Sequence, residues 1–256
     1  MMTIDHELLS EDVREIRLGG EATLDPDSLD RLERILGELE KDANCRVLVL
    51  SGSDPFCRGM DLGRVLSMAD GELQPCLEQF ARVLARLHHL KAVVIAVVDG
   101  EVAAGGVGLV AAADHVIATE RATFTLPEAV LGLVPAMVLP MLLGRMASQK
   151  ARWLAASALP CSAHRAREIG LVDVVTTHDE LERELKRLER QLVRVDPAAS
   201  RRIARLLSGL TSRSLEEALS AGASLTAERL RDPSVRRSIA AFLEGRSPWT
   251  IESEAV

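Results

Sequence analysis

The sequence predicts an α/β protein, and two features of the chain carry that prediction. Over residues 1–178, short β-branched runs alternate with segments in which apolar residues recur at helical spacing. Strands separated by helices indicate parallel crossover connections. Over residues 179–256 the pattern shows helices alone. We therefore expect a mixed core followed by a C-terminal helical region, although the alternation by itself also fits an ordinary doubly wound sheet.

Capping and turn signals place the elements of the mixed core. Asp25 and Pro26 mark the start of the first helix, because aspartate caps helix N-termini and proline fits the first turn. The expected elements, in order, are a strand over 13–18, a helix over 26–41, a strand over 46–50, a helix over 73–89, a strand over 92–98, a helix over 105–112, a strand over 115–118, an extended stretch over 122–126, helices over 136–146, 149–156 and 163–169, and a strand over 172–175.

Four helices are expected in the C-terminal region. The first two cover residues 179–195 and 198–210. The run Ser214-Leu215-Glu216-Glu217 has the form of a capping box and opens the third helix. Asp232-Pro233 opens the fourth helix and Gly245 closes it.

The composition limits the kinds of partner. Hydrophobic residues make up 47% of the 256 residues, enough for a sizeable core, but with no Tyr, four Phe and two Trp the packing must be mainly aliphatic. The net charge of −7, carried by dispersed charges, disfavours sequence-independent binding of nucleic acid. We expect small or acyl-carrying partners and no nucleic acid.

The cysteines and the N-terminus bear on the compartment. The four cysteines form no C-x-x-C pair and are interpreted as small buried hydrophobes in a reducing compartment. The segment MMTIDHELLSEDV is polar and acidic, unlike a signal or transit peptide. No apolar run reaches the roughly 18 residues that a membrane span needs. We expect a soluble cytoplasmic protein without a membrane partner.

Two backbone-rich turns are the most informative motifs. PFCRGMDL (55–62) and DGEVAAGGVGL (99–109) each follow a short β-branched run, and both are poor in side chains that could do chemistry. Two small-residue turns at strand ends can direct two backbone N–H groups at one point. Such a pair would stabilise a thioester oxygen as it becomes an enolate, and one donor of this kind is typically worth about 2.7–4 kcal/mol.

Glu128 is the predicted acid and base. It lies in the almost wholly apolar stretch 124–143, where a lone ionisable group is costly unless it is paired or used. Partial burial would raise its pKa and make it a better base toward a thioester α-proton, and then a proton donor toward a departing hydroxyl. The ordinary alternative is a surface carboxylate in a loop.

The glycines also suggest two rival motifs. Gly100 and Gly105 have P-loop spacing, but Gly106 and Val107 stand where Lys and Ser/Thr belong. A degenerate dinucleotide fingerprint starts at Gly106, too far from the preceding strand end. Close helix packing alone remains an alternative. The six histidines form no metal-binding pattern, so we expect neither a metal nor a cofactor.

Across residues 13–175 these motifs closely resemble the crotonase family, the enoyl-CoA hydratases and isomerases. The first turn resembles the family's F-x-x-G-x-D motif and the second its glycine-rich turn. The resemblance implies oxyanion-hole amides at Met60 and Gly105, and it places the family's first glutamate at Gly108, which leaves Glu128 alone. It also implies a right-handed ββα spiral core and a C-terminal helical region that helps to form homotrimers, often stacked as hexamers.

Four further residues are expected on the substrate side. Gly106 would let the substrate approach the backbone, with Gly108 beside it in the same motif, and Asp61 would cap the next helix and hold the turn. Arg58, two residues before Met60, is the candidate for binding a distal substrate carboxylate. Its alternatives are to point to solvent or to meet a phosphate of the carrier arm.

The loss of the first glutamate argues against simple water addition to a 2-enoyl thioester. Within the family the chain is most similar to the dehydratase of polyketide β-branching cassettes, especially over DGEVAAGGVGLVAAADHVIA and FTLPEAVLGLVPAMVLPML. This resemblance implies a hydro-lyase that converts a 3-hydroxy-3-methylglutaryl group, carried on the phosphopantetheine of an acyl-carrier protein, to a 3-methylglutaconyl thioester. The alternatives are a catabolic acyl-CoA hydratase or isomerase, and a binding protein of crotonase fold that has lost activity.

The basic residues between Lys186 and Arg205 have two interpretations. The simpler is a solvated helical face that neighbouring acidic residues balance. The other is a docking surface for an acidic acyl-carrier protein or for a phosphopantetheine phosphate.

Overall fold

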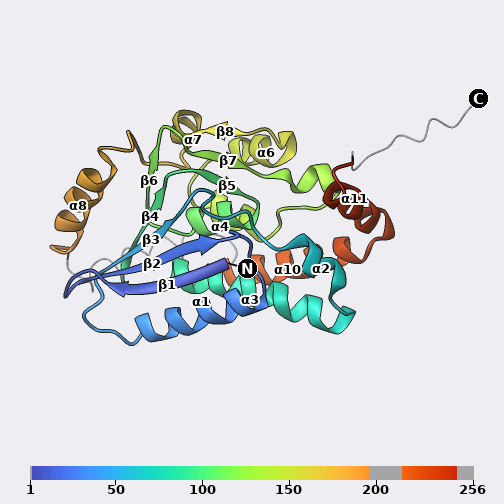
Figure 1. The fold of residues 1–256 in the computed structure, drawn as a ribbon, viewed down its shortest axis with the longest axis horizontal. Coiled ribbons are helices and arrows are strands. Elements are labelled where there is room, and N and C mark those ends of the chain that lie inside the picture. Colours follow the sequence, from blue (N-terminus) through green and yellow to red (C-terminus); the bar gives the residue numbers. More distant parts are fainter. Residues whose placement is uncertain (1, 196–214, 247–256) are drawn as a thin grey trace, which may run out of the picture.

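The computed structural model describes residues 2–195 and 215–246 (Figure 1). The main sheet has six strands in the order β1-β2-β3-β4-β6-β9, and a second sheet has three in the order β5-β7-β8. The main-sheet strands are β1 (Met2–Leu8), β2 (Val13–Gly20), β3 (Val47–Gly52), β4 (Val93–Val98), β6 (His115–Thr119) and β9 (Val174–Thr176). The second sheet consists of β5 (Glu101–Ala103), β7 (Thr123–Thr125) and β8 (Cys161–Ser162).

From β2 to β9 the neighbours in the main sheet pair in parallel, as the alternation of strands and helices predicts. The helices are α1 (Pro26–Leu39), α2 (Leu62–Ser67), α3 (Asp70–His88), α4 (Gly105–Ala111), the 3-10 helix η1 (Pro127–Leu131), α5 (Val138–Leu143), α6 (Ser148–Ser157), α7 (Ala163–Ile169), α8 (Leu181–Leu192), α10 (Leu215–Arg231) and α11 (Pro233–Leu243). The helix predicted over 198–210 and the capping residue Ser214 lie outside the described residues.

Alternate residues of the strands point to opposite faces of the main sheet, and each face packs against helices. One face carries residues such as Ile16, Leu48 and Ala96 into the large core shared with α1 and α3. The other face presents a valine-rich set that packs against leucines of α8. Figure 1 shows α8 at the end of the molecule away from α11. The two predicted turns of the candidate site follow the ends of β3 and β4 in this sheet.

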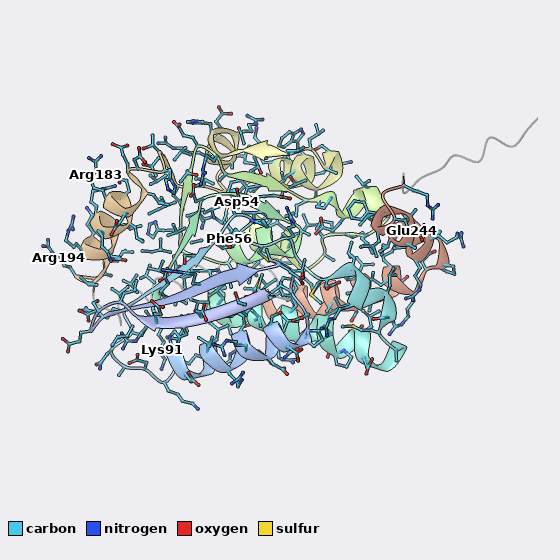
Figure 2. The ribbon with its side chains drawn as sticks, in the orientation of Figure 1. Asp54, Phe56, Lys91, Arg183, Arg194 and Glu244 are labelled. Carbon is cyan, nitrogen blue, oxygen red and sulfur yellow. The ribbon has the colours of Figure 1, made fainter. Side chains whose placement is uncertain are left out.

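The outer side of α8 is charged. Arg183, Lys186 and Arg187 pair with glutamates three residues away along the helix, at N–O distances of 2.8, 2.9 and 2.9 Å. Figure 2 shows Arg183 and Arg194 at the periphery of the molecule. The three basic side chains reach solvent, as on a solvated helical face, but Glu189, the partner of Lys186, is buried. The part of the basic run beyond Val195 is outside the described residues.

The predicted caps are confirmed where the structure describes them. The Asp25 carboxylate accepts from the Ser28 amide at 2.9 Å, and the Ser28 hydroxyl accepts from the Asp25 amide at 2.7 Å. Asp232 caps α11 by accepting from the Ser234 amide at 2.8 Å. These bonds satisfy helix N–H groups that have no partner within the helix.

Several elements were not predicted. The polar N-terminal segment forms β1, an antiparallel edge strand that buries Met2 and Ile4 through alternation too short to recognise amid charged neighbours. The glycine-rich segment is more than a turn, because it contains β5, which pairs with β7. Strands of two or three residues carry almost no periodic signal.

The second sheet brings the two predicted turns together. The amide of Phe56 donates to the Glu101 carbonyl at 2.9 Å, and the amide of Ala103 donates to the Cys57 carbonyl at 2.8 Å. Cys57 therefore forms a parallel bridge with Val102 of β5. The first turn is attached to the strand that leads directly into the second.

Candidate active site

The amide of Met60 is free to face a ligand. Met60 forms a parallel bridge with Leu24, in which Leu24 donates to the Gly59 carbonyl at 2.7 Å and accepts from the Asp61 amide at 2.8 Å. In such a bridge the N–H of the central residue points away from the partner strand. Within residues 2–195 and 215–246, the Met60 amide donates to no protein oxygen.

The Gly105 amide is free for a different reason. Gly105 is the first residue of α4, where the N–H has no intrahelical partner. The residue before it, Ala104, has a φ of 49° and donates its own amide to the Thr125 carbonyl at 3.0 Å. In the described part of the chain, no protein oxygen accepts from Gly105. Two unused amides, one from each turn, are thus available for an oxyanion.

The two turns approach each other at glycines. Gly59 has a φ of +82°, and a Cβ built on it would lie 2.7 Å from the Gly105 nitrogen. A Cβ on Gly105 would lie 3.0 Å from Cζ of Phe80, a buried side chain of α3. A side chain at Gly59 would strike the Gly105 backbone, and one at Gly105 would crowd Phe80, so the close approach of the two turns depends on these glycines.

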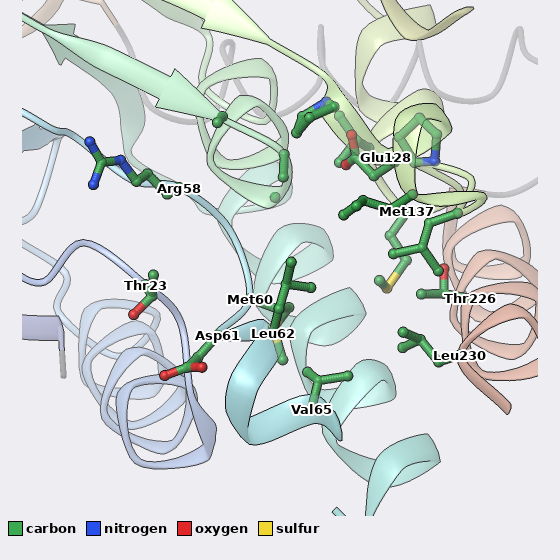
Figure 3. Close-up of a pocket in the computed structure, with 18 of the residues that line it drawn as sticks. Thr23, Arg58, Met60, Asp61, Leu62, Val65, Glu128, Met137, Thr226 and Leu230 are labelled. Carbon is green, nitrogen blue, oxygen red and sulfur yellow. The ribbon is translucent and has the colours of Figure 1, made fainter. Parts of the chain in front are cut away.

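Met60 and Gly105 both line a cavity of about 640 Å³ (Figure 3). Its walls are mostly apolar and come from α3, the segment around η1 and α5, and the C-terminal helices. The apolar lining includes Leu77, Phe80, Leu131, Leu133, Met137, Val138, Leu230 and Phe242. Such a chamber suits an acyl chain.

Glu128 lies in this cavity, as predicted. It is carried by η1, and Figure 3 shows it on the wall next to Met137. Part of the residue remains accessible, but its Oε2 is buried and has no hydrogen-bond partner among the described residues. Burial raises the pKa of Glu128 from 4.5 to about 7. A carboxyl group near half-ionisation at neutral pH can both take and return a proton.

Arg58 and Asp61 line the same cavity but are already engaged. Two N–H groups of Arg58 donate to Oε2 of Glu101, from Nη2 at 2.8 Å and from Nε at 3.2 Å. Both side chains of this pair are about half exposed, 50% and 43%, so they form the open rim of the cavity. Figure 3 shows Arg58 on the side opposite Glu128. Asp61 caps α2 by accepting from the Arg64 amide at 3.0 Å, which confirms its predicted structural role.

The expectation that Gly106 opens room for the substrate requires correction. Gly106 does not line the cavity, and a Cβ on it would lie 2.2 Å from the Cys57 carbonyl oxygen. The missing side chain makes room for the first turn, not for a ligand. Gly106 therefore acts on the site indirectly, by letting the two turns pack.

Gly108 also lies behind the cavity wall and not on it. Its Cβ would contact Val138 Cγ2 at 3.3 Å and Leu84 Cδ1 at 3.5 Å. Val138 lines the cavity, so a side chain at Gly108 would have to pass it to reach a ligand. Apolar packing thus surrounds position 108, to which the resemblance assigns the family's first glutamate.

Several residues that line the cavity were not predicted from the sequence. Thr125, Thr226, Leu230 and Phe242 all contribute to the cavity. The last three come from α10 and α11, about a hundred residues after Glu128 in the chain. No motif marks them, because an amphipathic helix shows which face is apolar but not which neighbour it covers.

Other groups are not arranged for chemistry. All four cysteines are buried and unpaired, and burial raises the pKa of Cys57 to about 12. In the part of the chain that the structure describes, no three His, Cys, Asp or Glu side chains are grouped so as to hold a metal ion. No described helix is long and apolar enough to cross a membrane.

The two sheets thus bring two unused amides and the Glu128 carboxylate to one mostly apolar cavity. Residues 14–252 match the enoyl-CoA hydratase/isomerase family, and the chain belongs to that family. This confirms the resemblance to crotonases and identifies an enzyme of the hydratase and dehydratase kind.

Two curated relatives and one solved structure make the comparison more specific. The bacillaene synthase dehydratase PksH of Bacillus subtilis (strain 168) is 31% identical over 233 residues, 89% of this chain and 88% of that protein. The solved structure of PksH from Bacillus subtilis superposes with a TM-score of 0.84 at 25% identity, covering 94% of this chain and 97% of that one. YngF, an enoyl-CoA hydratase/isomerase by name from the same strain, is 35% identical over 159 residues, which is 60% of each chain.

Proposed function

We propose that this enzyme removes water from a 3-hydroxy-3-methylglutaryl thioester on an acyl-carrier protein, giving a 3-methylglutaconyl thioester. The observation that carries the proposal is that Glu128, whose Oε2 is buried and without a partner among the described residues, shares a cavity with the two unused amides of Met60 and Gly105. Similarity to a named dehydratase of polyketide synthesis over most of the chain supports this choice within the family.

The residues support a complete elimination. The thioester carbonyl oxygen would accept from the Met60 and Gly105 amides, which stabilise the negative charge as the enolate forms. The ionised form of Glu128 takes the C2 proton, and the C2–H electron pair moves toward the carbonyl. As the enolate collapses to the C2–C3 double bond, the C3–O bond breaks and the proton on Glu128 leaves with the hydroxyl as water. One carboxyl group serves both steps, so the enzyme ends in its starting protonation state.

Packing at Gly108 is the reason that one carboxylate, Glu128, would carry out both proton transfers. Gly108 lies against Val138 and Leu84, so no carboxylate stands at this position. The remaining charged lining residues of the described chain are Arg58, Asp61 and Glu101, two of them in the half-exposed rim pair. A reaction that needs two opposed carboxylates is therefore poorly supported.

The distal carboxylate of the proposed acyl group needs a partner. Arg58 is the cation on the described cavity lining, and its guanidinium retains donors beyond the two that meet Glu101. We propose that Arg58 binds this carboxylate at the rim. The carrier is phosphopantetheine or CoA, and no further cofactor is required.

A catabolic acyl-CoA hydratase or isomerase is the second candidate. The apolar inner wall favours it, because Leu131, Leu230 and their neighbours would hold a neutral acyl chain as readily as a branched polar one. The 35% identity to YngF points the same way.

Turnover of matched substrates separates the candidates. The 3-hydroxy-3-methylglutaryl thioester is offered on an acyl-carrier protein and on CoA, beside crotonyl-CoA, and loss or gain of water is followed by mass spectrometry. Dehydration with preference for the carrier-bound substrate supports the proposal. Fast hydration of crotonyl-CoA with no dehydration assigns the catabolic role, and carrier binding with no turnover of any substrate assigns a binding protein.

A further inference from the structure

The turn that follows Glu128 is held by a residue of helix α10 that does not line the cavity, Arg229. The 3-10 helix η1 ends at Gly132, which has a φ of +74°, and the Leu133 amide returns to the Glu128 carbonyl at 2.9 Å. The carbonyl oxygen of Gly132 accepts from Nε of Arg229 at 3.0 Å. Ninety-seven residues separate this donor from its acceptor along the chain.

The Arg229 side chain is itself fixed. Its Nη1 donates to Oδ2 of Asp232 at 3.1 Å, while Oδ1 of Asp232 accepts from the amide and the hydroxyl of Ser234 at 2.8 and 2.7 Å. Asp232 is the N-cap of α11, and these hydrogen bonds hold the pKa of its carboxyl below the usual range. The guanidinium is thus oriented by a charged helix cap.

A second contact fixes α10 against the same segment. Gly222, two turns before Arg229, packs so tightly that a Cβ on it would lie 2.5 Å from the Ala136 carbonyl oxygen. On the same helix, Thr226 between these contacts and Leu230 next to Arg229 line the cavity (Figure 3). Helix α10 therefore supports the segment from Gly132 to Ala136 at both ends, immediately after Glu128.

We propose that Arg229 is a positioning residue, which directs the Glu128 carboxyl group into the cavity by holding the Gly132 carbonyl. The Arg229 guanidinium contacts the turn and not the reacting atoms. Without this bond, the left-handed turn at Gly132 loses its external support and η1 can rotate. A displacement of about 1 Å in a catalytic group can cost on the order of 100-fold in rate. The inference rests on Glu128 as the acid and base but not on a particular acyl group.

The test uses the full chain and four variants. Arg229→Ala removes the bond, Arg229→Lys keeps one donor for Gly132, and Asp232→Asn keeps the helix cap but removes the charge that orients Arg229. Arg237→Ala is the matched control, because Arg237 is exposed on α11 and no described residue forms a hydrogen bond or ion pair with its side chain. The best-turned-over thioester of the wild-type enzyme serves for kinetics.

We expect Arg229→Ala to lower kcat about 10- to 100-fold with KM changed less than about threefold, because alignment is lost and binding is not. Arg229→Lys should recover most of the rate and Asp232→Asn should fall between. Arg237→Ala should match the wild type. A folded Arg229→Ala variant with kcat within about twofold of the wild type would overturn the proposal.

Carbon-13 NMR of carboxyl-labelled glutamate supplies a readout that needs no substrate. The titration midpoint assigned to Glu128 by its absence in Glu128→Gln should move toward the ordinary glutamate value in Arg229→Ala, because the carboxyl turns toward solvent. If this midpoint moves while wild-type enzyme fails to dehydrate the glutaryl thioester, the proposed reaction fails and the positioning role stands. If the midpoint stays and the rate is retained, the positioning role fails.

Discussion

Gly106 lies against the backbone of Cys57, so closely that a Cβ on the glycine would stand 2.2 Å from the Cys57 carbonyl oxygen. The Cys57 carbonyl also accepts from the Ala103 amide at 2.8 Å, which ties the first turn to β5. The distance between the two candidate oxyanion amides, Met60 and Gly105, therefore depends on a position that never meets the ligand. This relationship gives the first prediction.

Gly106→Ala should lower kcat and destabilise the protein by about 1–3 kcal/mol, because overpacking a rigid contact forces the backbone to shift. Urea denaturation and steady-state kinetics measure both effects. Gly71→Ala is the control, since a Cβ at Gly71 meets nothing within 4 Å. A rise in KM alone at Gly106, with unchanged stability, would contradict this role and return Gly106 to the substrate side.

Glu128→Gln should retain the fold and lose about 10²–10⁴-fold in kcat, because the amide has nearly the same shape but cannot accept the α-proton. Rates of the wild type and the variant on the same thioester measure the loss, and circular dichroism verifies the fold. For the wild type, kcat/KM should rise with pH through a midpoint near 7, the pKa of Glu128 in the folded protein. A variant with near wild-type rate would remove Glu128 from the mechanism.

The buried carboxyl group should also make stability depend on pH. Burial raises the pKa of Glu128 from 4.5 to about 7 on folding, so the folded state binds this proton more tightly than the unfolded state does. The contribution to stability is full at low pH and declines as pH rises from 4.5 to about 7. Above that range the charged side chain costs about 3 kcal/mol.

Glu128→Gln should abolish this decline, so its free energy of unfolding should exceed that of the wild type more at about pH 8 than at about pH 4. Urea titrations at both pH values test it. Parallel pH profiles for the two proteins would show that Glu128 is solvated in the folded state.

Gly108→Glu should not create an efficient hydratase. The added side chain would enter the packing between Val138 and Leu84, which its Cβ alone would approach to 3.3 and 3.5 Å, and its charge would be buried without a partner. We expect lower stability and at most weak hydration of crotonyl-CoA. Gly108→Ala separates the steric effect from the charge. Hydration near the rate of a dedicated hydratase would contradict the prediction.

Arg58→Ala should reduce kcat/KM for the 3-hydroxy-3-methylglutaryl thioester far more than for an analogue without the distal carboxylate. Loss of one charge-assisted contact predicts roughly a 10- to 100-fold selective effect. Glu101→Gln is the companion variant, because it frees the guanidinium from its partner at 2.8 Å and should strengthen binding of the carboxylated substrate. Equal losses on both substrates would assign Arg58 to the shared carrier arm.

The sequence by itself determined the order of most elements and indicated the residues of the candidate site. Parallel crossovers followed from β-branched runs separated by helices, and Asp25 and Asp232 were recognisable caps, because these signals are local. Glu128 was recognisable because it lies in an apolar stretch, where burial of an unpaired carboxylate is energetically unfavourable. The resemblance of the two turns to a family motif supplied the amides of Met60 and Gly105.

Only the tertiary structure decided which glycines face protein and which face the cavity. A glycine has no side chain, so its position in the sequence does not indicate what it will contact. It showed that Gly106 accommodates Cys57, that Arg58 is held by Glu101, and that α10 supplies Arg229 to the turn after Glu128. These contacts join residues far apart in the chain. Packing of whole elements, and not local propensity, brings such residues together.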